Sequence, residues 1–174
     1  MRLHVAEVAL AGVLIAGCSG EEGGTTTPPA EPSGTQTSPT AEDTALEAYE
    51  QMWGVLVDEA RNQKPDYSSL QDYATGDALA LVEHGVFAEA DEGVVARGAP
   101  VLSPEVISKE DSRIEIEDCM DSSDWLREDG QTGDLVEPSP EDPLLRKIDA
   151  SVTFDGLSWK VAELQIWETG SCDA

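Results

Sequence analysis

Asp118 is the ionisable residue whose surroundings in the sequence most favour chemistry. It follows Ile114 and Ile116 at alternating spacing, so the three side chains share one face of a predicted strand. A carboxyl group held against apolar side chains has a raised pKa and can act as an acid or base near neutral pH. A simpler interpretation places Asp118 at the start of a solvated turn with Asp121 and Asp124, and the sequence leaves both open.

Other combinations of reactive side chains are sparse. Asp118, Asp121 and Asp124 recur at every third residue, whereas a calcium-binding EF-hand loop alternates its ligands and adds a glycine and a distal glutamate. His84 is the only histidine beyond the first few residues, and the chain contains no GxSxG, HExxH or glycine-rich phosphate-binding motif. The sequence therefore identifies no catalytic residue, no metal site and no cofactor. We interpret His84 as a surface or helix-packing residue.

The charge of the chain excludes one class of partner. The sequence has 36 acidic and 10 basic residues, which gives a formal net charge of −26 at pH 7. Such a polyanion is repelled by DNA, RNA and anionic lipid headgroups, so we exclude nucleic-acid binding. The charge is typical of a protein kept soluble outside the cell; a basic partner or a cation is the alternative interpretation.

The N-terminus has the pattern of a secretion signal. Arg2 precedes an uncharged segment over 8–16, which is shorter than the roughly 20 apolar residues of a membrane span. Residues 14–18 (LIAGC) resemble the lipobox of bacterial lipoproteins, in which the cysteine is acylated and the chain is cut before it. Glu7 departs from this pattern, and a plain signal peptide or an apolar cytosolic N-terminus is the alternative. The resemblance implies that residues 1–17 are removed and that Cys18 carries acyl chains, which anchor the protein to the extracytoplasmic face of the cell membrane.

Two segments follow the predicted anchor. Residues 18–40 are rich in Thr, Pro, Gly and Ser and contain no large apolar side chain, so we expect a disordered tether. Residues 41–174 are long enough to bury a core of their own, and we predict one domain there.

Lipidation of Cys18 would leave two cysteines, Cys119 and Cys172. An even pair in an oxidising compartment predicts a disulfide bond. Closing a loop of this length would stabilise the domain by about 4 kcal/mol in the chain-entropy model. It would also fasten the C-terminus to an interior strand.

Three helices are predicted at the start of the domain. Thr44 and Glu47 have the spacing of a capping box, which predicts a helix over 44–63. A short helix over 68–74 and a third, capped by Thr75 and ending near Asp91, complete the set.

Strands are expected in the remainder of the domain. The predicted strands lie over 93–100, 101–107 and 113–119, near Trp125, and then over 144–154 and 157–167. Asp155-Gly156 is a strong hairpin signal, and a two-residue turn would pair Phe154 with Leu157. Farther along this hairpin the apolar residues change face. Either a bulge near Ala162 explains the change, or the strand is covered on both sides.

This order predicts an α+β domain with three N-terminal helices packed on a curved, mainly antiparallel sheet of four to six strands. Together with Tyr49 and Trp53 in the first helix, residues 73–75 (YAT) and residues 159–161 (WKV), it resembles the nuclear-transport-factor-two-like cone family, which includes ketosteroid isomerase and polyketide cyclases. The resemblance implies a pocket between the sheet and the first helix. It suggests these lining residues: Tyr49, Trp53, Tyr73, His84, Asp118 and Glu163.

The function indicated by these features is a membrane-anchored, non-catalytic module that binds a small apolar ligand or an extracytoplasmic protein partner. One alternative is an enzyme of isomerase, dehydratase or cyclase type that uses a carboxylate in the cone pocket. The tyrosine and aspartate arrangement of ketosteroid isomerase cannot be matched position by position, so no catalytic residue is carried over. A structural accessory domain of the cell envelope is the second alternative. The sequence does not indicate an oligomeric state.

Overall fold

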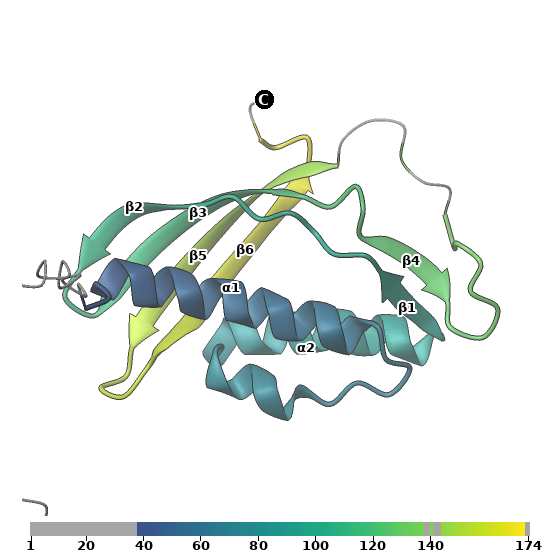
Figure 1. Ribbon diagram of the computed structural model, residues 1–174, viewed down its shortest axis with the longest axis horizontal. Coiled ribbons are helices and arrows are strands. Elements are labelled where there is room, and N and C mark those ends of the chain that lie inside the picture. The colour runs from purple at the N-terminus through teal and green to yellow at the C-terminus, as the bar shows by residue number, and fades with distance from the viewer. Residues whose placement is uncertain (1–37, 138–139, 141–143, 173–174) are drawn as a thin grey trace, which may run out of the picture. The chain divides into compact units, whose positions relative to one another are not determined.

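The computed structural model describes residues 38–137, 140 and 144–172. The predicted signal peptide, Cys18 and most of the tether lie outside these residues. Figure 1 shows the order of the elements, which are α1 (Ala41–Ala60), the 3-10 helix η1 (Tyr67–Asp72), α2 (Gly76–Asp91), β1 (Val94–Arg97), β2 (Pro104–Glu110), β3 (Arg113–Asp121), β4 (Leu126–Asp129), β5 (Leu145–Phe154) and β6 (Trp159–Thr169).

The strands form two separate sheets. β2, β3, β5 and β6 make an antiparallel four-stranded sheet in that order, while β1 and β4 pair with each other. Helices α1 and α2 lie side by side against one face of the larger sheet (Figure 1). The segment between η1 and α2 extends the edge of this sheet, because Ala74 forms a parallel bridge with Val161 of β6.

The prediction of three N-terminal helices on a single sheet is wrong. The part of the chain that the structure describes has two α-helices, and the segment predicted as a second helix forms the six-residue 3-10 helix η1. Among the η1 side chains that the structure describes, Leu70 is the one that is buried, and so short a segment has little apolar surface to stabilise a full α-helix. The strands near residues 94 and 126 leave the main sheet because they pair with each other.

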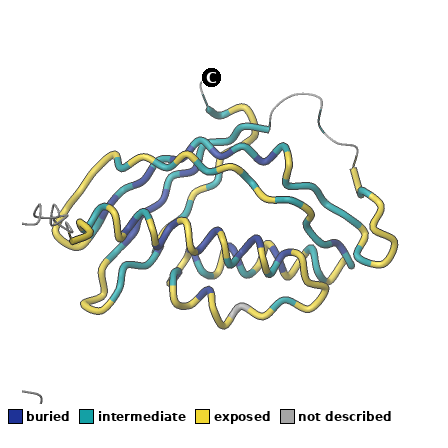
Figure 2. Tube along the Cα trace, viewed as in Figure 1, coloured by how far each residue is buried: buried dark blue, intermediate teal, exposed yellow. Residues whose placement is uncertain are grey.

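Alternation along β3 explains how the sheet faces the helices. Ile114, Ile116, Asp118 and Met120 are buried, and the residues between them are partly exposed. Ile114, Ile116 and Met120 join the buried side chains of both helices in one apolar cluster. Figure 2 shows the same contrast, with dark blue segments where the helices meet the sheet and yellow along the outer edges. The core therefore lies between one face of the larger sheet and the helix pair.

The first helix begins earlier than predicted. The Thr40 hydroxyl accepts a hydrogen bond from the Asp43 N–H at 3.2 Å, and the Asp43 carboxylate accepts one from the Thr40 N–H at 2.8 Å. This reciprocal pair is the real capping box, so the cap predicted at Thr44 is wrong. Thr44 lies inside the helix, where its hydroxyl donates to the Thr40 carbonyl. The helix ends at Ala60, close to the predicted boundary.

The hairpin has a longer loop than predicted. Phe154 pairs with Trp159, so four residues connect the strands and the predicted partnership of Phe154 with Leu157 is wrong. Asp155 determines this loop, because its carboxylate accepts hydrogen bonds from the N–H groups of Leu157 and Ser158. Farther along, the register shifts at Ala162, which confirms the alternative of a bulge at that position.

Candidate functional site

A cavity of about 650 Å³ lies where α1 and α2 meet the smaller sheet and the nearby ends of β3, β5 and β6. Its volume is within the range of about 300–1,000 Å³ that is typical of small-molecule sites. Most of its wall is apolar. The larger apolar lining residues are Trp53, Leu56, Val82, Val86, Val94, Met120, Trp125, Leu126, Leu144 and Ile166.

Gly98 lets the wall of this cavity close. It follows β1 with a φ of +80°, and a Cβ atom at this position would lie only 1.9 Å from the Asp124 carbonyl oxygen. Glycine alone permits so close an approach of two backbone segments. The approach holds β1 against the segment that carries Trp125, whose side chain lines the cavity.

Three aromatic rings connect the buried core to the cavity. Tyr49 and Trp53 meet edge to face with ring centroids 6.4 Å apart, and Trp53 meets Trp125 in the same way at 6.1 Å. Such contacts add to the stabilisation that the rings already provide by burying apolar area. Tyr49 and Trp53 are one helical turn apart on α1, so the sequence fixes their contact, but only the fold brings Trp125 to them.

Two arginines contribute cationic groups to the wall. Arg127 forms ion pairs with Glu89 at 2.7 Å and with Glu137 at 3.4 Å, and all three residues line the cavity. Arg146 lines it at the start of β5, where its guanidinium donates to the Thr169 hydroxyl at 3.0 Å. The polar part of the wall therefore contains one cation matched by carboxylates and one bonded to a hydroxyl.

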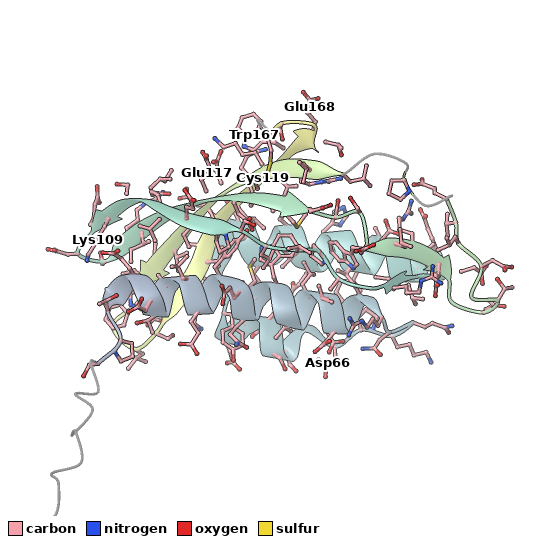
Figure 3. The ribbon with its side chains drawn as sticks, turned by 45° about the horizontal axis from the view of Figure 1, so that its top comes forward. Asp66, Lys109, Glu117, Cys119, Trp167 and Glu168 are labelled. Atoms are coloured by element: carbon pink, nitrogen blue, oxygen red, sulfur yellow. A yellow bond between two sulfur atoms is a disulfide. The ribbon has the colours of Figure 1, made fainter. Side chains whose placement is uncertain are left out.

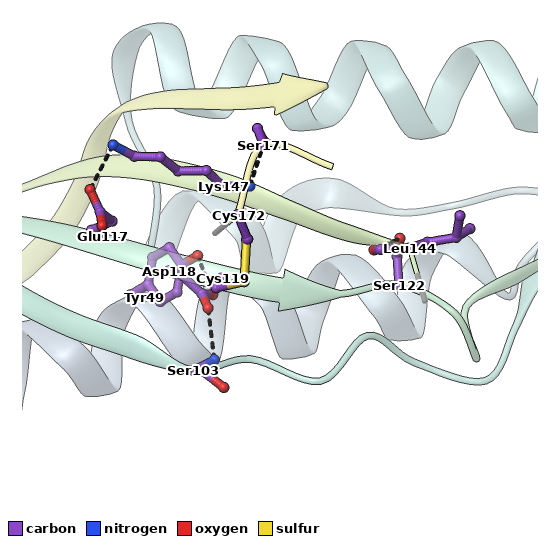
Figure 4. The surroundings of a disulfide bond; sticks show 10 residues. All are labelled: Tyr49, Ser103, Glu117, Asp118, Cys119, Ser122, Leu144, Lys147, Ser171 and Cys172. Carbon is purple, nitrogen blue, oxygen red and sulfur yellow. Dashed lines mark hydrogen bonds and ion pairs between the residues drawn. A yellow bond between two sulfur atoms is a disulfide. The ribbon is translucent and has the colours of Figure 1, made fainter. Parts of the chain in front are cut away.

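Asp118 is buried in the core and does not line this cavity. Its carboxylate accepts hydrogen bonds from the Tyr49 hydroxyl at 2.8 Å and from the Ser103 N–H at 2.7 Å, as Figure 4 shows. Burial raises the pKa of Asp118, while the bonds from Ser103 and Tyr49 act in the opposite direction. Burial, together with the Asp118 charge and hydrogen bond, raises the pKa of Tyr49. The hydroxyl thus stays protonated and ties α1 to β3.

We expect Asp118→Asn to change how stability depends on pH. Because the pKa of Asp118 is raised on folding, its contribution is full below about pH 4 and is lost as pH rises through the folded pKa. The free energy of unfolding of the wild type, minus that of the variant, should therefore fall as the pH rises above about 4 in urea titrations.

Asp121→Asn is the matched control for that measurement. Hydrogen bonds from the Ser123 hydroxyl and N–H lower the pKa of Asp121, so its contribution is present at neutral pH and is lost on acidification. The difference between wild type and this variant should rise with pH. The same slope in both variants would contradict the account of Asp118.

The predicted disulfide between Cys119 and Cys172 is confirmed. After β6, Gly170 donates to the Leu145 carbonyl and the Ser171 hydroxyl accepts from the Lys147 N–H, so the C-terminal segment crosses β5 to reach β3 (Figure 4). Figure 3 shows Cys119 on the outer face of the sheet, away from the helices. The bond therefore fastens the chain end without entering the core.

The other predicted lining residues lie in different places. Trp53 lines the cavity, and Tyr49 is engaged with Asp118. Tyr73 borders a shallower groove beside the β5–β6 hairpin, and His84 is exposed on α2.

Glu163 is at the surface of β6 and forms an ion pair with Arg113 at 3.1 Å. The sequence thus identified one of the cavity residues and did not identify Trp125 or Arg146.

Two further observations concern the described residues only. Within them, no group of three or more His, Cys, Asp or Glu side chains is arranged to hold a metal ion. Asp121 instead bonds to Ser123, and Asp118 to Tyr49 and Ser103. None of the helices in this part of the chain has the length and apolar character needed to cross a membrane.

Comparison with known proteins bears on the fold alone. No family model matches the sequence, and no curated protein does. Several solved chains are similar. The crystal structure of the intermembrane space region of chloroplast protein ARC6 superposes with a TM-score of 0.50 at 16% identity, over 72% of this chain and 97% of that one. The arrangement of helices and strands is therefore shared with a solved protein, while the cone-family resemblance stays a prediction.

Proposed function

We propose that this protein is a lipid-anchored, extracytoplasmic module that binds a small apolar ligand in the cavity between its helices and sheets. The observation that carries the proposal is the cavity itself, which combines a volume of about 650 Å³ with a largely apolar wall. The disulfide supports the location, because such bonds are typical of oxidising compartments outside the cytosol. A mass spectrum of the native protein that retained residues 1–17 and lacked an acyl group would contradict the anchor.

The catalytic alternative has less support. Both oxygens of Asp118 accept hydrogen bonds from within the fold, and the residue does not line the cavity. Glu163 is paired with Arg113 at the surface. A ligand in the cavity would therefore meet neither of the carboxylates proposed for proton transfer.

Two glycines allow a matched test of ligand binding. Gly85 on α2 lines the cavity, whereas Gly54 on α1 does not, and a Cβ atom at either position would meet nothing within 4 Å. Both lie in helices, where replacing glycine favours the helical conformation. Gly85→Phe should therefore partly fill the cavity. Gly54→Phe should add the same ring to α1 at an exposed position outside the cavity.

The measurement uses N-phenylnaphthylamine, a neutral dye that fluoresces in apolar surroundings, with dodecanol as the competitor. The chain from residue 18 with Cys18→Ser is suitable, because the core lies within the compact unit Thr37–Ala174. Wild type should bind the dye and release it to dodecanol, and Gly85→Phe should weaken binding about tenfold, since losing room for two methylene groups has this effect. Absence of displaceable binding, or equal weakening by Gly54→Phe, would contradict the proposal.

A further inference from the structure

The unsatisfied polar groups of this fold are concentrated around the cavity. Among the described residues, three buried side-chain polar atoms lack a hydrogen-bond partner: Trp53 Nε1, Trp125 Nε1 and Arg146 Nε. All three residues line the cavity, although they come from α1, from the turn before β4 and from the start of β5. A buried polar group without a partner is unfavourable, and such groups are rare. Because all three residues line the cavity, a molecule held in it is the most direct source of the missing acceptors.

The chemistry of these atoms restricts that partner. Each of the three is an N–H donor, and none is an acceptor. The Trp53 N–H lies near the Tyr49 hydroxyl and affects the pKa of that group, but it is not in hydrogen-bonding geometry. Trp125 Nε1 and Arg146 Nε form no hydrogen bond either, although Nη2 of the same guanidinium donates to the Thr169 hydroxyl. A complementary ligand must therefore carry hydrogen-bond acceptors.

The charge of Arg146 favours a negatively charged acceptor. Arg146 pairs across the sheet with Met120, whose side chain is buried among the helices, so both belong to the inner face. Among the residues that the structure describes, no carboxylate forms an ion pair with Arg146. Arg127, on the same cavity wall, has two carboxylate partners. A partly buried cation without a counter-charge is stabilised by an anion.

We propose that the ligand is an apolar molecule with one oxyanion group, such as a carboxylate. The oxyanion binds Arg146 and Trp125, and the apolar part lies against the helix side chains Leu56, Val82 and Val86. This inference rests on the proposed function, because it names the ligand class of the same cavity. The net charge of −26 repels anions in general, so selective binding depends on these local donors.

The test compares dodecanoate with dodecanol, which share one alkyl chain and differ in the oxyanion. Both are titrated against dye-loaded protein at pH 8. Arg146→Met removes the charge and the donors but keeps a long apolar side chain. Since a hydrogen bond to a charged group contributes enough for about a tenfold effect, the preference for dodecanoate over dodecanol should fall by about that factor in this variant.

Lys64→Met is the matched control, because it removes the same charge at an exposed position outside the cavity. It should leave the preference unchanged. If Arg146→Met does not fold, Trp125→Phe replaces it, since this change deletes the N–H and keeps an aromatic ring. Equal binding of both compounds, unaffected by either cavity variant, would overturn the oxyanion and leave the proposed function standing. Failure of both compounds to bind wild type would overturn the proposed function and this inference with it.

Discussion

Replacing both Cys119 and Cys172 with serine is expected to lower the free energy of unfolding by about 4 kcal/mol. The two residues are 53 positions apart, and cross-linking them removes the entropy of that loop from the unfolded chain. Since domains of this size are stable by about 5–15 kcal/mol, the loss is a large fraction of the total. Urea unfolding of wild type and of the double variant measures the difference directly.

Reduction provides an independent control for this prediction. Wild type treated with a thiol reductant should become as unstable as the serine variant, whereas the variant itself should not respond to reductant. Thiol titration of the denatured wild-type chain, with Cys18 replaced, should find no free thiol. Equal unfolding midpoints for oxidised wild type and the double variant would show that the bond contributes nothing.

Gly98→Ala is expected to have the second large effect, a loss of about 3 kcal/mol or more in the free energy of unfolding. An alanine at this position would adopt a φ of +80°, which is unfavourable for residues with a side chain. Its Cβ would also lie 1.9 Å from the Asp124 carbonyl oxygen, so the backbone on one side must move. The displaced segment carries Trp125, and binding of the neutral dye should weaken in parallel.

Gly133→Ala separates the effect of a positive φ from the effect of the close contact with the Asp124 carbonyl. Gly133 also has a positive φ, of +75°, but a Cβ atom there would meet nothing within 4 Å. It should cost only the backbone strain, about 1–2 kcal/mol, and should leave dye binding unchanged. If urea unfolding gives the same loss for both variants, the close approach at Gly98 is not what holds the cavity wall.

Local patterns in the sequence were sufficient for several parts of the fold. Alternation placed Ile114, Ile116 and Asp118 on one buried face of β3, because successive side chains of a strand point to opposite faces. The boundaries of α2 followed from Thr75 before it and Gly93 after it. The capping box was assigned to the wrong threonine, since Thr40-Asp43 and Thr44-Glu47 have the same spacing and the sequence does not rank them.

The site depended on contacts that no local pattern contains. Arg146 continues the inward-facing series of Ile148 and Ala150, so the sequence offered a signal: a charged residue where an apolar one is expected. Trp125 carried no comparable signal. Its place at the cavity depends on Gly98, which is distant in the sequence and approaches it only after β1 pairs with β4.

The sequence by itself determined the disulfide pairing, the course of most strands and the strongly acidic character of the chain. These properties depend on residue type, spacing and number. Tertiary structure alone decided that the strands divide into two sheets, that Asp118 is tied to Tyr49 in the core, and that the cavity opens beside Trp125 and Arg146. The physical reason is that a cavity and its unpaired donors arise where separate elements meet, and the spacing of residues within one element does not specify that meeting.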